Sequence, residues 1–230
     1  TAAVVENTSQ LDADWRAGLA ALRQSRLSRF GSPLYVLPWF LAMGPDETTR
    51  SAMLRRVAAR DAVTAGGDEQ PVLQWWMLPG MVLLDPAPVA GAEGAAPAES
   101  GWKRMLHWMM HTRRREPLNG LVLAFSASWL SESGDAELAE AGQRLRGRLD
   151  ELVRVYNARI PVYIVVTQCE TLRGFADWAG SLGSLAENQA MGYLHKGALQ
   201  GVGEFIDDAF GHIVARMGER LRHLRHRHDR

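Results

Sequence analysis

Residues 34–51 read LYVLPWFLAMGPDETTRS, and the predicted fold depends on this stretch. An apolar run ends at Gly44, a polar loop follows, and apolar residues at helical spacing begin directly after the loop. Short apolar runs bounded by turn residues are typical of buried strands, whereas apolar spacings of three and four are typical of amphipathic helices. The stretch therefore predicts a strand, a loop at its end, and a helix.

The loop keeps the residue spacing of a phosphate-binding P-loop, Gly-x-x-x-x-Gly-Lys-Ser/Thr. Gly44 is followed by four residues and then by Thr49, Arg50 and Ser51. Thr49 places a β-branched side chain where the motif needs a permissive glycine. Arg50 keeps the positive charge but replaces a compact ammonium with a rigid guanidinium. The spacing is preserved, and the chemistry at the second glycine and at the lysine is altered.

Two acidic residues in the same loop, Asp46 and Glu47, argue against binding of a polyphosphate. At an effective dielectric constant of about 20, two like charges about 4 Å apart repel by roughly 4 kcal/mol. That energy corresponds to about three orders of magnitude in affinity. The alternative is a plain strand-to-helix turn with acidic residues at the helix N-terminus, where they are favoured.

Two later apolar runs end where nucleotide-binding proteins place functional residues. Asp85 ends the run 81–85, at the position of the magnesium-side aspartate of a P-loop NTPase. Pro88, three residues further on, has no N–H to offer a γ-phosphate.

The third position follows the apolar run 160–166. Thr167 to Glu170 stand where GTPase-like proteins carry an Asn/Thr-Lys-x-Asp motif for the base, and Gln168 replaces the lysine. Three nucleotide-site positions thus occur in the right order, and each is altered.

Several blocks resemble the cytoplasmic domain of the IcmF family of type VI secretion membrane-complex proteins. The resemblance is carried by residues 37–45, 75–76, 83–85, 115–122, 160–170, 174–175 and 189–193. The Pro117-Leu118-Asn119-Gly120 and Pro161-Val162-Tyr163 blocks are distinctive for this family and are not general NTPase features.

This resemblance implies a GTPase-like P-loop NTPase fold with degenerate motifs, at the cytoplasmic face of the bacterial inner membrane. Many family members keep an intact Gly-Lys-Thr loop, from which this chain departs at Thr49 and Arg50. The implied partners are the cytoplasmic domain of TssL and the baseplate. The implied contact with the membrane is made only by segments that this chain does not contain.

The expected function is that of a docking scaffold, a pseudo-NTPase without cofactor and without catalytic residues. The alternative is a working ATPase or GTPase that binds its nucleotide with magnesium and uses Arg50 in place of the P-loop lysine. In either case the nucleotide site, vestigial or active, consists of Gly44, Asp46, Glu47, Thr49, Arg50, Ser51, Asp85, Thr167 and Glu170.

Alternating strand and helix patterns predict an α/β fold, a mostly parallel sheet with helices on both faces. The expected strands are 33–43, 72–77, 81–85, 121–125 and 160–166, the second and third forming a hairpin. The expected helices are 11–28, 49–64, 102–114, 135–158, 175–181 and 199–224. We predict an N-terminal helical flank (1–30), an NTPase-like domain (31–195) with a mobile loop at 86–101, and a C-terminal helix with a basic tail (196–230).

The composition sets further limits. The chain has 26 basic and 26 acidic residues, which argues against a general nucleic-acid or anionic-lipid binder. Basic clusters at 113–115 and 220–228 leave local binding of this kind as a third hypothesis. The single cysteine, Cys169, excludes an intramolecular disulfide framework. His107 and His111 share a helix face, but without a third ligand we expect no metal site.

Overall fold

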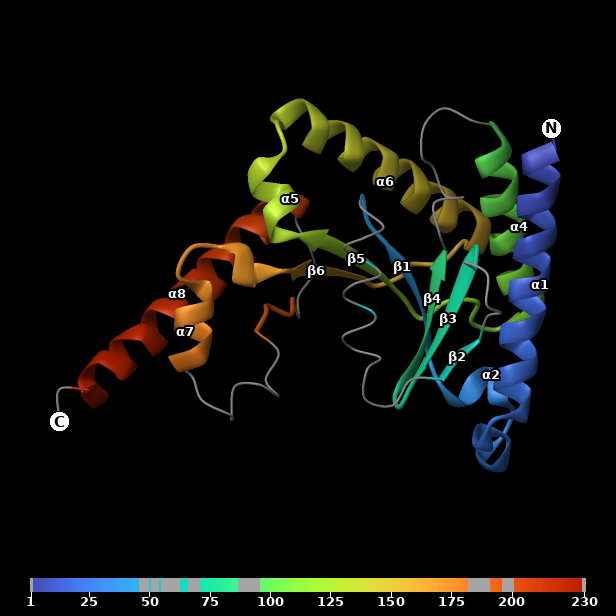
Figure 1. Cartoon of the computed structure of the whole chain (residues 1–230), viewed down its shortest axis with the longest axis horizontal. Helices are drawn as coiled ribbons and strands as arrows, with labels where there is room; N and C mark the ends of the chain where they lie inside the picture. Colours follow the sequence, from blue (N-terminus) through green and yellow to red (C-terminus); the bar gives the residue numbers. More distant parts are fainter. Residues whose placement is uncertain are drawn as a thin grey trace. The chain divides into compact units, whose positions relative to one another are not determined.

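The computed structural model describes residues 2–45, 50, 54, 63–65, 71–86, 96–181, 191–195 and 201–228. Six strands form one sheet in the order β2-β3-β4-β1-β5-β6 (Figure 1). The neighbours from β4 through β1 and β5 to β6 are parallel, whereas β2, β3 and β4 pair antiparallel. The predicted α/β class with a mostly parallel sheet is therefore confirmed.

The strands are β1 (Trp39–Met43), β2 (Val63–Ala65), β3 (Leu73–Leu78), β4 (Met81–Pro86), β5 (Gly120–Ser126) and β6 (Val162–Thr167). Strands β3 and β4 form the predicted hairpin, with Leu78 opposite Met81. Strand β1 lies at the centre, where Leu41 is in register with Leu84 on one side and with Leu121 on the other.

The helices of the first part of the chain are α1 (Ala2–Gln24), η1 (Arg26–Phe30), α2 (Pro33–Val36), α4 (Ala96–Thr112), α5 (Ala127–Glu132) and α6 (Asp135–Tyr156). Helix α6 confirms the helix predicted at 135–158. Helix α5, which the apolar pattern did not predict, begins where the Ser126 hydroxyl accepts a hydrogen bond from the backbone N–H of Trp129.

Side chains of the central strands alternate between two apolar clusters, as the period of two in a strand requires. Leu41 and Met43 join the larger cluster, and Ala42, between them, joins the smaller one with Leu54. Helices α1, α4 and α6 contribute to the larger cluster through Leu11, Trp15, Leu22, Trp102, Met105, Leu106, Met109 and Leu152. These three helices therefore cover one face of the sheet (Figure 1).

Helix α1 packs into the larger apolar cluster, which forms the main core. Trp15 contacts Trp75 at 5.1 Å between ring centroids and Trp108 at 5.6 Å. A Cβ at Gly18 would lie 2.2 Å from the Trp75 ring, so only glycine allows this close approach. The buried Asp14 carboxylate accepts hydrogen bonds from the backbone N–H groups of Val72, at 2.7 Å, and Leu73, at 3.0 Å. The predicted helix at 11–28 thus exists, and it joins the sheet through core contacts.

Two of the expected elements around β1 are wrong at their ends. The strand begins at Trp39 and not at Pro33, because Pro33 starts the short helix α2 and Pro38 lacks a donor for the sheet. The Pro38 carbonyl still accepts from the N–H of Val82 at 2.9 Å. The helix predicted over 49–64 is wrong at its C-terminal end, because Val63 and Thr64 belong to strand β2.

The mobile loop predicted at 86–101 is wrong at both ends. Pro86 is the last residue of β4, and α4 already begins at Ala96. Alanine has the highest helix propensity, and proline is tolerated in the first helical turn, where Pro97 lies. Residues 87–95 lie outside the described part of the chain.

Strand β6 was expected to be buried, and this is wrong. It occurs as predicted at Val162–Thr167, but it is the last strand in the sheet order. Ile164 is 54% exposed and Val162 is 45% exposed. The apolar run therefore predicted the strand correctly. It predicted the burial of the strand incorrectly, because burial depends on neighbours that lie elsewhere in the chain.

Contacts divide the chain into two units, Thr1–Gln168 and Cys169–Arg230. The second contains η3 (Cys169–Thr171), α7 (Phe175–Ser181) and α8 (Val202–His228), which confirm the two helices predicted there. Trp178 is buried against Phe175, with 5.4 Å between ring centroids. Tyr193 contacts Phe205 at 5.8 Å. The three-part division predicted from the sequence stays a prediction.

Candidate functional site

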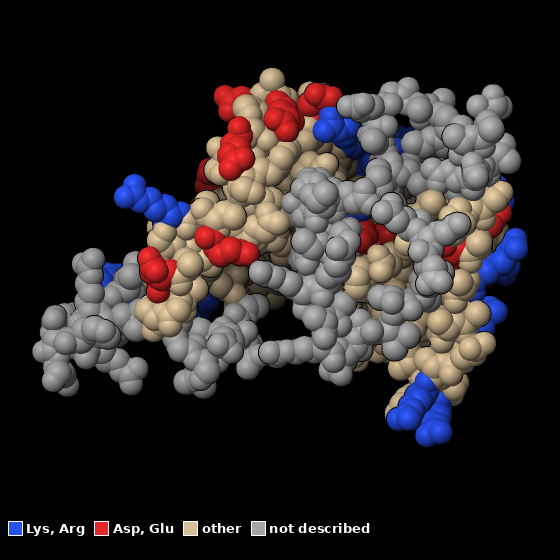
Figure 2. Space-filling model, viewed as in Figure 1, with Lys and Arg blue, Asp and Glu red and all other residues tan. Residues whose placement is uncertain are grey.

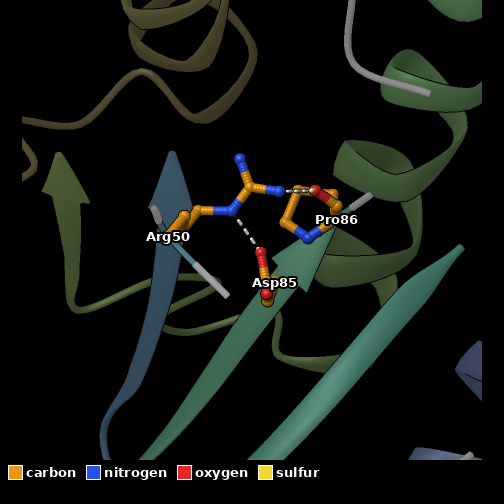
Figure 3. A network of polar contacts seen from close by, with 3 residues as sticks. All are labelled: Arg50, Asp85 and Pro86. Atoms are coloured by element: carbon orange, nitrogen blue, oxygen red, sulfur yellow. Dashed lines mark hydrogen bonds and ion pairs between the residues drawn. The ribbon is translucent and has the colours of Figure 1, made fainter. Parts of the chain in front are cut away.

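The candidate site lies at the edge of the sheet where the parallel strands end. Arg50 donates from Nε to the Oδ1 of Asp85, the residue before the end of β4, and from Nη2 to the Pro86 carbonyl at 2.7 Å (Figure 3). Two residues that the sequence assigned to one nucleotide site are thus brought together from positions 35 residues apart. They contact each other directly.

Burial dominates the electrostatics of this pair. The side chains of Arg50 and Asp85 are 7% and 4% exposed. Burial raises the pKa of Asp85 above the ordinary aspartate value, and the positive charge and hydrogen bond of Arg50 oppose that rise. A buried charge is stable only when it is paired and hydrogen-bonded, so each of these two side chains depends on the other.

Gly44 follows β1 directly, and the packing of the neighbouring strand explains why this residue is a glycine. A Cβ at this position would lie 2.4 Å from the backbone carbonyl oxygen of Ala124 in β5. Any side chain would push β1 and β5 apart. Glycine is therefore required here by strand packing, whether or not a phosphate binds.

A second polar group lies at the ends of β5 and β6. The Gln168 side-chain oxygen accepts from the Ser126 hydroxyl at 2.7 Å, and Thr167 donates to the Phe125 carbonyl at 3.2 Å. Gln168 has a φ of 54°, an uncommon value for a residue with a side chain. The sequence analysis did not predict two serines of this group, Ser126 and Ser128, whose hydroxyl oxygens lie 2.6 Å apart. Ser126 could have been found, because it ends an apolar run.

Of the remaining residues of the predicted site, the structure describes Glu170. Glu170 lies in η3 of the second unit, as the acidic residue of its first turn. Asp46, Glu47, Thr49 and Ser51 lie outside the described residues, and so does Pro88. Their assignment to the site stays a prediction.

The Pro-Leu-Asn-Gly block has a structural role at the opposite edge of the sheet. The Asn119 side chain accepts from the backbone N–H of Trp39 at 2.8 Å and from Arg113 Nη1 at 3.0 Å. Arg113 is buried, and its guanidinium carbon lies 4.9 Å from the Trp39 ring centroid and 5.2 Å from that of Tyr35. Burial lowers the pKa of Arg113. This block fixes the start of β1.

His107 and His111 lie side by side on α4, with 3.9 Å between ring centroids. The Nδ1 of His111 donates to the His107 carbonyl at 2.9 Å. Within the described ranges, no three His, Cys, Asp or Glu side chains gather as a metal site requires. Among the helices described, none combines the length and the apolar character that a membrane span needs.

Comparison with known proteins identifies relatives of this chain. Residues 96–230, more than half of it, match the sequence model of the IcmF-related N-terminal domain. The chain is also 29% identical over 205 residues to the type VI secretion system component TssM1 of Pseudomonas aeruginosa. That similarity covers 83% of this chain and 18% of the relative, so the chain spans about a fifth of the relative's length. The chain belongs to the IcmF-related family.

Proposed function

We propose that this chain is a docking scaffold of a type VI secretion inner-membrane complex, built on a degenerate P-loop NTPase fold. The observation that carries the proposal is the buried ion pair between Arg50 and Asp85. In a working P-loop NTPase the lysine at the first position contacts the outer phosphates, and the aspartate at the second helps to hold magnesium. Here the two side chains neutralise each other.

The order of the strands supports the same ancestry. Strand β1 is central and parallel, its C-terminal end leads through Gly44 to Arg50, and Asp85 lies near the end of the neighbouring parallel strand β4. Ligands of open α/β sheets bind at the carboxyl ends of the strands. The ion pair fills the centre of that edge.

The relative's name supports the assignment to a secretion complex, since TssM1 is a type VI secretion component. We place this chain at the cytoplasmic face of the inner membrane, in contact with the cytoplasmic domain of TssL and with the baseplate. Docking of this kind requires a stable surface and no turnover, which a fold with an internally neutralised site can supply.

Isothermal titration of this chain with Mg-ATP and with Mg-GTP tests the loss of the nucleotide site. We expect no binding at micromolar concentrations, because a nucleotide would have to break the Arg50–Asp85 pair and leave Asp85 buried beside phosphates. Binding of either nucleotide with micromolar affinity would contradict the pseudo-NTPase part of the proposal.

Arg50→Lys is the matched variant, since it keeps a cation for Asp85 and restores the lysine of a working P-loop. For a scaffold, the variant binds the TssL cytoplasmic domain as tightly as the parent chain.

For the alternative, a working NTPase that uses Arg50, nucleotide turnover rises above a buffer blank in the parent chain and is lost in Arg50→Ala.

A further inference from the structure

One end of the first unit is basic and carries an exposed aromatic side chain. From Trp15 to Pro45 the chain contains four arginines and no acidic residue. We call the exposed part of this region the basic end; it consists of Arg23, Arg26, Arg29, Phe30 and Tyr35. Figure 2 shows the blue side chains of this region over η1, at the lower right.

The turn that carries the basic end is firmly built. The Ser25 hydroxyl accepts from the N–H of Leu27 and donates to the Leu22 carbonyl at 2.6 Å. Leu27 packs against the main core, and Gly31 ends the turn with a φ of 137°. Phe30, between these anchors, is 79% exposed. Aromatic and arginine side chains are both enriched at protein–protein interfaces, and this turn presents the two kinds together.

Among the described residues, no carboxylate lies within ion-pair distance of Arg23, Arg26 or Arg29. In contrast, Arg144 and Arg146 on α6 each pair with an acid one turn away, at 2.6 and 2.9 Å. The basic end therefore presents positive charge that no acid of the described residues neutralises.

A second surface of the same unit has the opposite character. From Glu132 to Gln143 the chain contains four acidic residues and no basic one. We call this surface, at α5 and the start of α6, the acidic end; it consists of Leu130, Glu132, Asp135, Glu137 and Glu140. Glu140 pairs with Arg144 within α6 at 2.6 Å and Glu137 accepts a hydrogen bond from Trp129 Nε1 at 3.0 Å, so Glu132 and Asp135 are the acids of this surface without an ion-pair partner among the described residues. Leu130 is 38% exposed among these charges. Figure 2 shows the red side chains gathered there.

The two ends match in charge and in apolar character, and they lie far apart on the first unit. In Figure 1, η1 is at the lower right of this unit and the start of α6 at its upper left. They cannot meet within one molecule. We propose that the basic end of one copy binds the acidic end of a second copy, with Phe30 against Leu130 and the arginines against Glu132 and its neighbours.

Such a contact joins two different surfaces and is therefore heterologous, so it adds copies head to tail and closes only as a ring. Each such contact uses both surfaces. An anionic lipid surface would account for the basic end alone. The inference does not depend on the nucleotide site.

Sedimentation velocity over a concentration series tests the contact directly. We expect concentration-dependent association in about 0.1 M salt and its loss in about 1 M salt, where the Debye length falls from about 10 Å to about 3 Å. Association that is absent at low salt, or that does not change with salt, overturns the proposal.

Two charge-reversed variants make the test specific. Arg26→Glu with Arg29→Glu reverses the basic end, and Glu132→Lys with Asp135→Lys reverses the acidic end. Alone, each weakens association by about tenfold or more, because attraction becomes repulsion at every contact. Mixed in equal amounts, the two variants associate again, since the reversed ends complement each other.

The control is Arg154→Glu with Arg159→Glu, which makes the same change of charge on exposed arginines away from both ends. It associates like the parent chain, and all variants are first checked for unchanged thermal melting. A mixture that stays monomeric overturns the proposal. So does an arginine-dependent binding to phosphatidylglycerol vesicles without self-association, which would identify the basic end as a lipid surface.

Discussion

At the scale of single residues, the pairing of Arg50 with Asp85 gives this site its character. Both side chains are buried, and among the residues described each is the other's only ion-pair partner. A cation that in a P-loop would face a phosphate is held by an acid of the same chain. The residue types alone gave no indication of this contact.

We predict that Arg50→Ala lowers the free energy of unfolding by roughly 3–5 kcal/mol near neutral pH, because it leaves a buried carboxylate unpaired. Urea unfolding measures this loss. In the double variant Arg50→Ala with Asp85→Asn most of the loss disappears, because the uncompensated charge is gone. An additive double variant, as destabilised as the sum of its parts, would contradict a direct pair.

The same substitution has a defined pH dependence. Burial raises the pKa of Asp85, and Arg50 is the first opposing influence. Without Arg50 the folded protein binds a proton at Asp85 more readily than the unfolded chain does, so stability rises as pH falls. We therefore expect Arg50→Ala to be less destabilising at pH 5 than at pH 8, as urea unfolding at both values would show.

At the scale of elements, Asp14 joins helix α1 to strand β3. Its carboxylate satisfies two backbone N–H groups at the start of β3, and Gln10 donates to its other oxygen at 3.0 Å. Asp12, on the same helix, forms only an exposed pair with Arg104 at 2.8 Å. The two aspartates are a natural comparison of a buried and an exposed acid.

We predict that Asp14→Ala lowers the free energy of unfolding by about 2–4 kcal/mol, because buried backbone donors lose a charged acceptor. Asp12→Ala, the matched control, costs less than about 1 kcal/mol, as is usual for an exposed ion pair. Chemical denaturation of both variants gives the comparison. Equal losses would mean that Asp14 does not anchor the strand.

At the scale of the whole molecule, the first unit folds as one body that includes its N-terminal helix. Leu11, Trp15 and Leu22 are buried in the main core, and Trp15 contacts both Trp75 of strand β3, before position 96 where the family match begins, and Trp108 of helix α4, after it. Each such side chain contributes roughly 1.5–3 kcal/mol by its burial. The whole of a domain's stability is only about 5–15 kcal/mol.

Removal of residues 1–30 is therefore expected to abolish cooperative folding. The truncated chain would expose the faces of Trp39 and Trp75 that α1 covers, and its thermal transition, followed by circular dichroism, would vanish. Removal of residues 1–8 is the control, because the described core begins at Leu11. A shortened chain (31–230) that melts like the parent would show that α1 is dispensable.

The sequence predicted most elements because strands and helices depend on local periodicity. The hairpin of β3 and β4, strand β5 and helices α6, α7 and α8 occur where the apolar pattern placed them. Errors fell at Pro33, at Val63 and at 86–101, where short segments offer too few residues to show a period. The exposure of β6 could not be predicted, because it depends on a neighbour that is distant in the chain.

For the candidate site, the sequence was enough to predict which residues end the strands, since polar residues after apolar runs mark the carboxyl edge of a parallel sheet. It named Gly44, Arg50, Asp85 and Thr167 in the correct order. The folded structure was needed to see that Arg50 contacts Asp85, that the approach of Ala124 requires glycine at position 44, and that Asn119 holds the start of β1. Spacing along the chain fixes an element, whereas a contact between two charges depends on their distance in space and on the water that burial removes.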